Sequence, residues 1–149
     1  MGPYRGVDYR ADRKEDAVPK VIVNPAWLPK PSGYSHGIEA RGRIMFIAGQ
    51  TAQDADGRIA PTGDLVGQFR HALANVGAVV GARGGTLRDL VKVTFYVVDK
   101  REYRAKAGEI GRVYREMMEG HWPAATLVEV RGLWDDDALI EIDAIAVLE

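Results

Sequence analysis

Glu141 carries a carboxylate at a position in the sequence where burial of that group would cost free energy. Glu141 lies inside the apolar run from Leu139 to Ile145. Burying an ionised carboxylate costs free energy unless the group is paired or hydrogen-bonded, so its presence there needs a reason. One reason is chemistry, because Glu141 would position or activate a water molecule as a general base. The other is structural: the side chain reaches solvent or a surface arginine.

Three ring-bearing side chains are further candidates. Tyr34 and His36 stand two residues apart and would point the same way along an extended strand. Tyr34 would stack over a flat ligand or donate its hydroxyl group, or else pack at the start of a strand. His36 suits acid–base work near neutral pH, although a surface or interface hydrogen bond is the commoner role of such a histidine. Trp122 would line a cleft or, as we favour, anchor the core.

The composition excludes several other chemistries. The chain has no cysteine, which excludes disulfides, zinc–thiolate sites, iron–sulfur clusters and a cysteine nucleophile. Its three histidines, His36, His71 and His121, lack the spacing of a metal site, so we expect no metal. The net charge of −1 argues against nucleic acid or an anionic membrane as the main partner. Without a membrane-spanning apolar run or a signal-peptide pattern, we expect a cytoplasmic protein.

The elements that must position these residues follow from the apolar periodicity. Residues 1–20 form a charged N-terminal extension that we expect to be flexible, because it has almost nothing apolar to bury. Residues 21–149 form one domain. Helices are predicted over 65–80, with Thr62 or Asp64 as N-cap, and over 103–118. The predicted strands are 21–23, 34–39, 44–48, 90–98, 126–130 and 139–147, with a tight turn at 41–43 joining the second to the third.

This order, β-β-β-α-β-α-β-β, predicts an α+β fold with two helices on one face of a sheet. Two helices can cover only one face, yet the strands at 90–98 and 139–147 carry apolar residues on both sides. An exposed face of an antiparallel sheet normally alternates with polar residues. We therefore expect the second face to be buried against another subunit.

Six short segments give the chain a resemblance to a known family. They are Gly33-Tyr34-Ser35-His36, Ile47-Ala48-Gly49-Gln50, Gln68 with Asn75-Val76, Val91-Lys92-Val93-Thr94 with Asp99, Trp122-Pro123-Ala124 and Glu141-Ile142-Asp143-Ala144-Ile145-Ala146. In this order they resemble the RidA/YjgF family of small cytosolic proteins, over residues 21–149. The resemblance implies a chorismate-mutase-like α+β fold, a homotrimer and ligand sites in the clefts between subunits. It implies no cofactor and no metal.

The same resemblance shows what this chain lacks. The best-known members hydrolyse reactive enamines and imines to a 2-keto acid and ammonia, and they hold the substrate carboxylate with an arginine. That arginine lies in a Pro-Ala-Arg-Ser or Pro-Ala-Arg-Thr segment, where this chain has Ala125. Ala48 stands in place of the family's serine, and Gly111 falls at the position of an asparagine on the second helix. The pocket is therefore expected to be less polar and without its anion clamp.

Three members of the family's site persist, and they carry the functional interpretation. Glu141 would handle protons, the Gly49 amide would bind an oxygen, and Tyr34 would form a wall. We interpret the protein as a RidA-like trimer that acts on or binds a small reactive nitrogen metabolite, by enamine or imine hydrolysis or related C=N chemistry. We do not expect a 2-iminoacid deaminase of the usual kind. The alternative is a non-catalytic trimer that binds a small metabolite or regulates a partner.

Three arginines are candidates to replace the missing cation. They are Arg43, Arg112 and Arg131. Arg131 shares a strand face with Glu129, so an ordinary cross-strand ion pair also explains it.

Overall fold

The computed structural model describes residues 20–149, so the predicted extension lies outside the described residues except for Lys20. The elements in chain order are β1 (Val21–Val23), β2 (Gly37–Glu39), β3 (Arg43–Gln50), α1 (Leu65–Gly81), the short 3-10 helix η1 (Leu87–Asp89), β4 (Leu90–Val97), α2 (Lys100–Ala105), α3 (Ala107–Met118), β5 (Ala124–Glu129) and β6 (Ile140–Leu148). Lys20 pairs with Asp89 at 2.9 Å, which ties the start of the described chain to η1.

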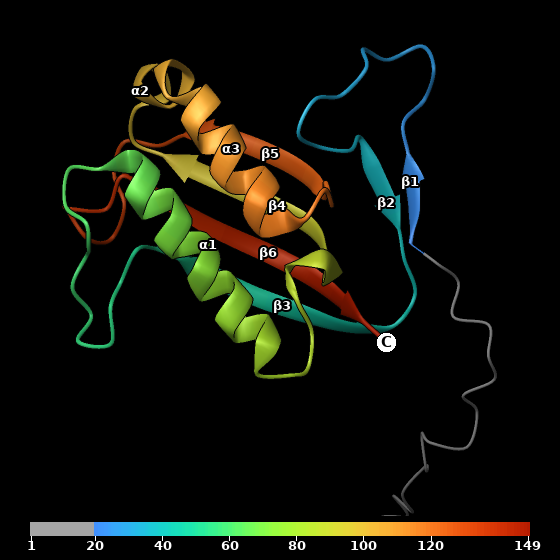
Figure 1. Cartoon of the computed structure of the whole chain (residues 1–149), viewed down its shortest axis with the longest axis horizontal. Coiled ribbons are helices and arrows are strands. Elements are labelled where there is room, and N and C mark those ends of the chain that lie inside the picture. The colour runs from blue at the N-terminus through green and yellow to red at the C-terminus, as the bar shows by residue number, and fades with distance from the viewer. Residues whose placement is uncertain (1–19) are drawn as a thin grey trace, which may run out of the picture.

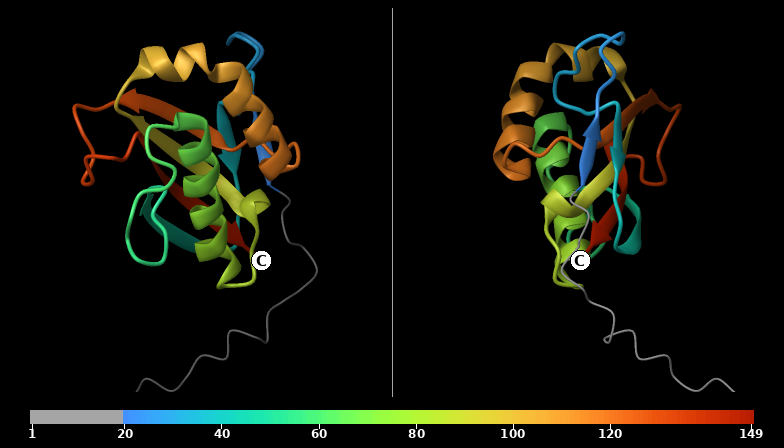
Figure 2. Two further views of the ribbon diagram at one scale, coloured as in Figure 1. Left: turned by 60° about the vertical axis from the view of Figure 1, so that its left-hand side comes forward. Right: turned by 90° about the vertical axis from the view of Figure 1, so that its right-hand side faces the viewer.

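One four-stranded sheet carries the domain, in the order β3-β6-β4-β5 (Figure 1). β6 is antiparallel to both of its neighbours, whereas β4 and β5 are parallel. The strands β1 and β2 form a separate antiparallel pair. The helices α1 and α3 lie together on one face of the sheet (Figure 2). This architecture confirms the predicted α+β fold.

The core lies between that face and the helices. The predicted apolar stripe of α1 is buried, and Asp64 is the N-cap, accepting a hydrogen bond from the Gly67 amide at 3.0 Å. The rings of Phe69, Phe95 and Tyr114 pack together with centroids 5.7–5.8 Å apart. Because these three rings come from α1, β4 and α3, they fix both helices to the sheet.

The predicted second helix is two helices. Lys106, with φ −98° and ψ 10°, leaves the helical conformation between α2 and α3. Asp99 caps α2 by accepting hydrogen bonds from the Arg101 and Glu102 amides at 2.8 and 3.1 Å. Apolar spacing continues across the break, so periodicity alone does not reveal it.

The strand predicted over 34–39 and its pairing also differ in the structure. The strand begins only at Gly37, and it pairs with β1 instead of β3. Gly42 has φ +152°, and a Cβ there would overlap the carbonyl of Leu148. The chain therefore passes the end of β6 at Gly42 without a hairpin turn, and β3 pairs with β6.

The face of the sheet turned away from the helices is mixed in character. On β3, Ile44 and Phe46 are 63% and 78% exposed. On β4, the residues of this open face are Lys92, Thr94 and Tyr96, so strand 90–98 is less apolar on its second side than expected. None of the helices in the described range is both long and apolar enough to cross a membrane.

Candidate functional site

Glu141 stands on the open face of the sheet, directly against Gly49. It lies on β6, half-buried and paired in register with Tyr96 of β4. Its carboxylate occupies the space beside Gly49, where a Cβ would overlap Oε1. Only glycine at this position leaves room for the carboxylate, so the predicted proximity of the Gly49 backbone and Glu141 is present within one chain.

A bulge in β3 creates this arrangement. Ile47 pairs with Ala144 and Gln50 pairs with Ile142, so Ala48 and Gly49 together stand opposite a single residue of β6, Asp143. A bulge leaves a residue outside the regular ladder and turns its backbone groups away from the partner strand. The bulge therefore places the Gly49 backbone beside the carboxylate of Glu141, while the Ala48 carbonyl accepts a hydrogen bond from the Gln50 side-chain amide at 3.1 Å.

A shallow hollow of about 340 Å³ opens over this carboxylate. Its lining includes Gly49, Tyr96, Glu141, Asp143 and the exposed Trp134. The Tyr96 hydroxyl donates to Asp143 at 3.1 Å, and this hydrogen bond raises the pKa of Tyr96. Asp143 is thus engaged, whereas Glu141 makes no ion pair with any residue in the range 20–149.

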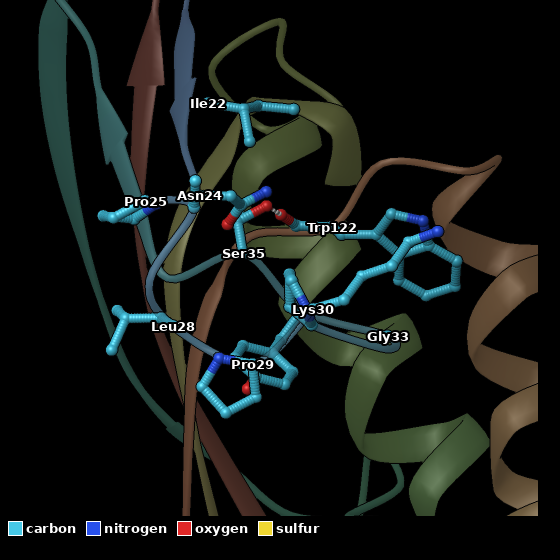
Figure 3. Close-up of a pocket in the computed structure, with 12 residues that line it drawn as sticks. Ile22, Asn24, Pro25, Leu28, Pro29, Lys30, Gly33, Ser35 and Trp122 are labelled. Carbon is cyan, nitrogen blue, oxygen red and sulfur yellow. Dashed lines mark hydrogen bonds between the residues drawn. The ribbon is translucent and has the colours of Figure 1, made fainter.

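Tyr34 is positioned by the neighbouring Ser35, which fixes its loop to the start of β5. The buried Ser35 hydroxyl donates to the Trp122 carbonyl at 2.6 Å, and the Ser35 amide donates to the Pro123 carbonyl at 3.2 Å. Figure 3 shows the first of these bonds inside a cavity of about 580 Å³ that the loop encloses with Trp122. The attachment brings Tyr34 beside Ala125 in a second cavity, of about 310 Å³.

A third cavity, of about 560 Å³, adjoins the one that contains Tyr34 and Ala125. It includes Gly111, and it shares Ser32, Gly33, Phe95 and Tyr103 with that cavity. Burial raises the pKa of Tyr103 to about 12, so its phenol is protonated at neutral pH. The fold therefore places Tyr34, Gly111 and Ala125 along two adjoining cavities that share lining residues.

The predicted site residues nevertheless form two groups within one chain. Ala125 pairs with Val93, a residue buried toward the helices. Glu141 pairs with Tyr96, on the open face. Paired residues share a face of a sheet, so Ala125 and Glu141 lie on opposite faces.

His36 and Trp122 have clear structural roles. The His36 ring lies 2.9 Å from the Pro29 carbonyl through Nε2 and packs edge-on against Tyr34 at 5.3 Å. Its amide donates to the Asn24 side chain at 2.8 Å, which makes His36 a loop-forming residue. Trp122 packs against the core beside Tyr114, at 5.4 Å, and also lines two of the cavities.

The three arginines suggested as replacements do not line these cavities. Arg43 donates to the Glu149 carbonyl at 3.1 Å, and Arg112 and Arg131 are exposed elsewhere. The structure instead places Arg115 in the cavity with Gly111. Arg115 was not predicted from the sequence, although residues four apart share a helix face and its spacing from Gly111 could have indicated it. Tyr96 and Asp143 were also missed, because strand register alone brings them to Glu141.

The described part of the chain offers no obvious metal centre. Within residues 20–149, no group of three His, Asp or Glu side chains is placed to hold a metal ion.

Comparison with known proteins shows to which family the chain belongs. The family model described as Endoribonuclease L-PSP matches residues 28–148. A RutC family protein of Pyrococcus horikoshii is 43% identical over 131 residues, which cover 87% of this chain and 99% of that protein. A 2-iminobutanoate/2-iminopropanoate deaminase of Dermatophagoides farinae is 30% identical over 132 residues, 88% of this chain and 98% of the relative.

A solved structure is similar over the same region. It is a protein of the conserved Rid family from Yersinia pestis, with a TM-score of 0.78 and 34% identity, covering 87% of this chain and 98% of that one. Because the family model and the relatives span most of the sequence, the chain belongs to the Endoribonuclease L-PSP family, that is, the RidA/YjgF family.

Proposed function

We propose that this protein hydrolyses a small imine or enamine in a cleft formed between two subunits. The observation that carries the proposal is the Glu141 carboxylate, held against the bulged Gly49 backbone without an ion-pair partner among residues 20–149. A carboxylate so placed is suited to take a proton from water. A relative bearing the name of an iminoacid deaminase supports the same chemistry.

The proposed reaction uses Glu141 as a proton carrier. The imine enters protonated on nitrogen. Glu141 accepts a proton from water while the water oxygen bonds to the carbon of the C=N group, and the electron pair of that double bond moves to nitrogen, which gives a neutral carbinolamine. Glu141 then returns its proton to that nitrogen, and the C–N bond breaks with its electron pair leaving on nitrogen while the hydroxyl group becomes the carbonyl and passes its proton to Glu141, which releases it with the ammonia. The products are a carbonyl compound and ammonia. The Gly49 amide would hydrogen-bond the developing hydroxyl oxygen.

The cleft is proposed to need two copies of the chain. Glu141 and Gly49 lie on the open face, whereas Tyr34, Gly111 and Ala125 lie along cavities beside β5. A second copy that covers the exposed Ile44 and Phe46 would bring one group toward the other. The homotrimer implied by the family resemblance is our proposed assembly.

The substrate is proposed to differ from that of a typical 2-iminoacid deaminase. A carboxylate that leaves water beside Ala125 meets no fixed cation there. We therefore expect poor turnover of 2-iminopropionate.

The test is hydrolysis of a panel of imines, each generated by an amino-acid oxidase and followed by trapping with semicarbazide. Glu141→Gln should lower the rate on the best substrate by about 100-fold or more, because it removes a general base. Glu39→Gln, which changes an exposed carboxylate on β2, is the matched control and should keep the full rate. Full activity of Glu141→Gln would refute the proposed role.

The runner-up function is binding of a small metabolite without turnover. Ala125 favours it, because an alanine there leaves the cavity beside Tyr34 without a reactive group at that position. Saturable binding by a wild-type protein that hydrolyses none of the imines would support this alternative.

A further inference from the structure

The cavity that contains Gly111 holds one charged side chain among its described lining residues. That side chain is Arg115, and the adjoining cavity with Ala125 adds no other charge from residues 20–149. The guanidinium Nη1 lies 3.5 Å from the point where a Cβ on Gly111 would stand. Gly111 thus puts no side chain beside the guanidinium, and both residues line the same cavity.

Arg115 has no carboxylate partner within residues 20–149. Two other arginines do pair with carboxylates, Arg70 with Glu116 at 3.0 Å and Arg88 with Glu119 at 3.9 Å. Three more on α2 and α3, Arg101, Arg104 and Arg112, form no ion pair among residues 20–149. A guanidinium presents a planar pair of N–H donors that matches a carboxylate. Because the Arg115 guanidinium forms no ion pair within residues 20–149, its N–H donors are available to a ligand carboxylate in the cavity.

The walls of this cavity are aromatic. Four of its lining residues carry rings, namely Phe95, Tyr103, Tyr114 and Trp122. Its volume of about 560 Å³ falls in the range of sites for small organic ligands. Aromatic side chains bind flat rings through stacked or edge-on contacts. The cavity is thus lined by aromatic side chains and by one cationic side chain, Arg115.

We propose that Arg115 is the anion-binding residue of this protein and that the cavity takes a planar aromatic carboxylate. In the setting of the proposed function, on which this assignment rests for its link to catalysis, the ligand would be an aromatic 2-imino or 2-oxo acid. The carboxylate would be held from helix α3 instead of from strand β5, where Ala125 stands. A methyl-bearing acid such as 2-iminopropionate would leave most of the aromatic volume unfilled.

Binding of phenylacetate and of its neutral analogue phenylacetamide, measured by calorimetry, tests the assignment. The two compounds have the same ring and nearly the same shape, so their difference reports the charge. Wild-type protein should bind phenylacetate about tenfold or more tightly, as expected of a charge-assisted hydrogen-bonded pair. Equal affinities for the two compounds would overturn the proposal.

Two pairs of variants localise the effect. Arg115→Gln should weaken the binding of phenylacetate about tenfold or more and leave the affinity for phenylacetamide unchanged. Arg112→Gln, on the same helix, should change neither affinity. Gly111→Glu places a carboxylate four residues before Arg115 and should compete with the ligand. Gly108→Glu makes the same change four residues before Arg112, away from the cavity, and is the matched control.

The outcomes separate this inference from the proposed hydrolysis. Phenylacetate has no C=N bond, so its binding does not depend on catalysis. If Arg115→Gln loses phenylacetate while the wild-type protein hydrolyses no imine, the anion site stands and the hydrolase proposal falls. If imines are hydrolysed but Arg115→Gln binds phenylacetate as the wild type does, the anion site is wrong and the hydrolase proposal stands.

Discussion

At the scale of single residues, two glycines show how the absence of a side chain shapes this protein. The carboxylate of Glu141 fills the space beside Gly49, and the guanidinium of Arg115 lies over Gly111. The Glu141 carboxylate occupies the volume that a Cβ on Gly49 would fill, whereas the Arg115 guanidinium lies at ordinary contact distance, 3.5 Å, from where a Cβ on Gly111 would stand. The types of the charged residues alone therefore do not predict the candidate sites, because the glycine beside each one sets the space that its side chain can occupy.

Gly49→Ala should displace the Glu141 carboxylate while leaving the fold largely intact. The added methyl group meets the end of a flexible side chain, which can swing away, so the free energy of unfolding should fall by roughly 1 kcal/mol or less. Imine hydrolysis should fall much further than stability does. Urea unfolding and the coupled imine assay measure the two effects.

Gly42→Ala is the informative contrast to that variant. Its methyl group would meet the rigid backbone of Leu148 at a φ of +152°, so we expect a loss of roughly 1–3 kcal/mol of stability. Equal stability losses in Gly49→Ala and Gly42→Ala would show that the Glu141 carboxylate is held rigidly.

At the scale of elements, the segment from β4 to α3 positions most of the aromatic cavity. Asp99 follows β4 and is the N-cap of α2, and Tyr103 on α2 lines the cavity. Asp99→Ala removes a cap that accepts two backbone hydrogen bonds, so it should cost about 1 kcal/mol of stability. Urea unfolding measures this change.

Asp56→Ala serves as the control for the cap. Asp56 is exposed and pairs only with Arg58 at 2.7 Å among the described ion pairs, so its removal should change stability by less than about 0.5 kcal/mol. A loss in this variant as large as that in Asp99→Ala would contradict the capping interpretation.

The elements could be predicted from sequence to different degrees, for physical reasons. Helix α1 and strands β4 and β6 were predicted closely, because their apolar spacing reflects which face they bury. The pairing of β2 with β1 was not predicted, because strand pairing depends on contacts distant in sequence. Glu141 and Gly49 were predicted as one group through the family resemblance. Arg115 was not, because its role depends on how α3 is rotated over the sheet.

At the scale of the whole molecule, the separation of the two residue groups is the reason why we propose a cleft between copies. Glu141 lies on the open face, and Ala125 lies on the opposite face of the same sheet. A single chain would leave the base and the aromatic cavity apart. In the proposed cleft, assembly therefore decides activity as directly as any side chain does.

The assembly can be tested on the open face itself. Wild-type protein should scatter light as a particle of about three times the chain mass of 16.3 kDa. Phe46→Glu should dissociate it, because each copy would then bury an unpaired carboxylate in the interface. Trp27→Glu alters an aromatic residue that is similarly exposed, 84% against 78% for Phe46, but lies off the sheet, and it should leave the mass unchanged. A monomeric wild type would overturn the cleft between subunits, and a Phe46→Glu variant of unchanged mass would show that the exposed apolar residues of β3 do not hold the copies together.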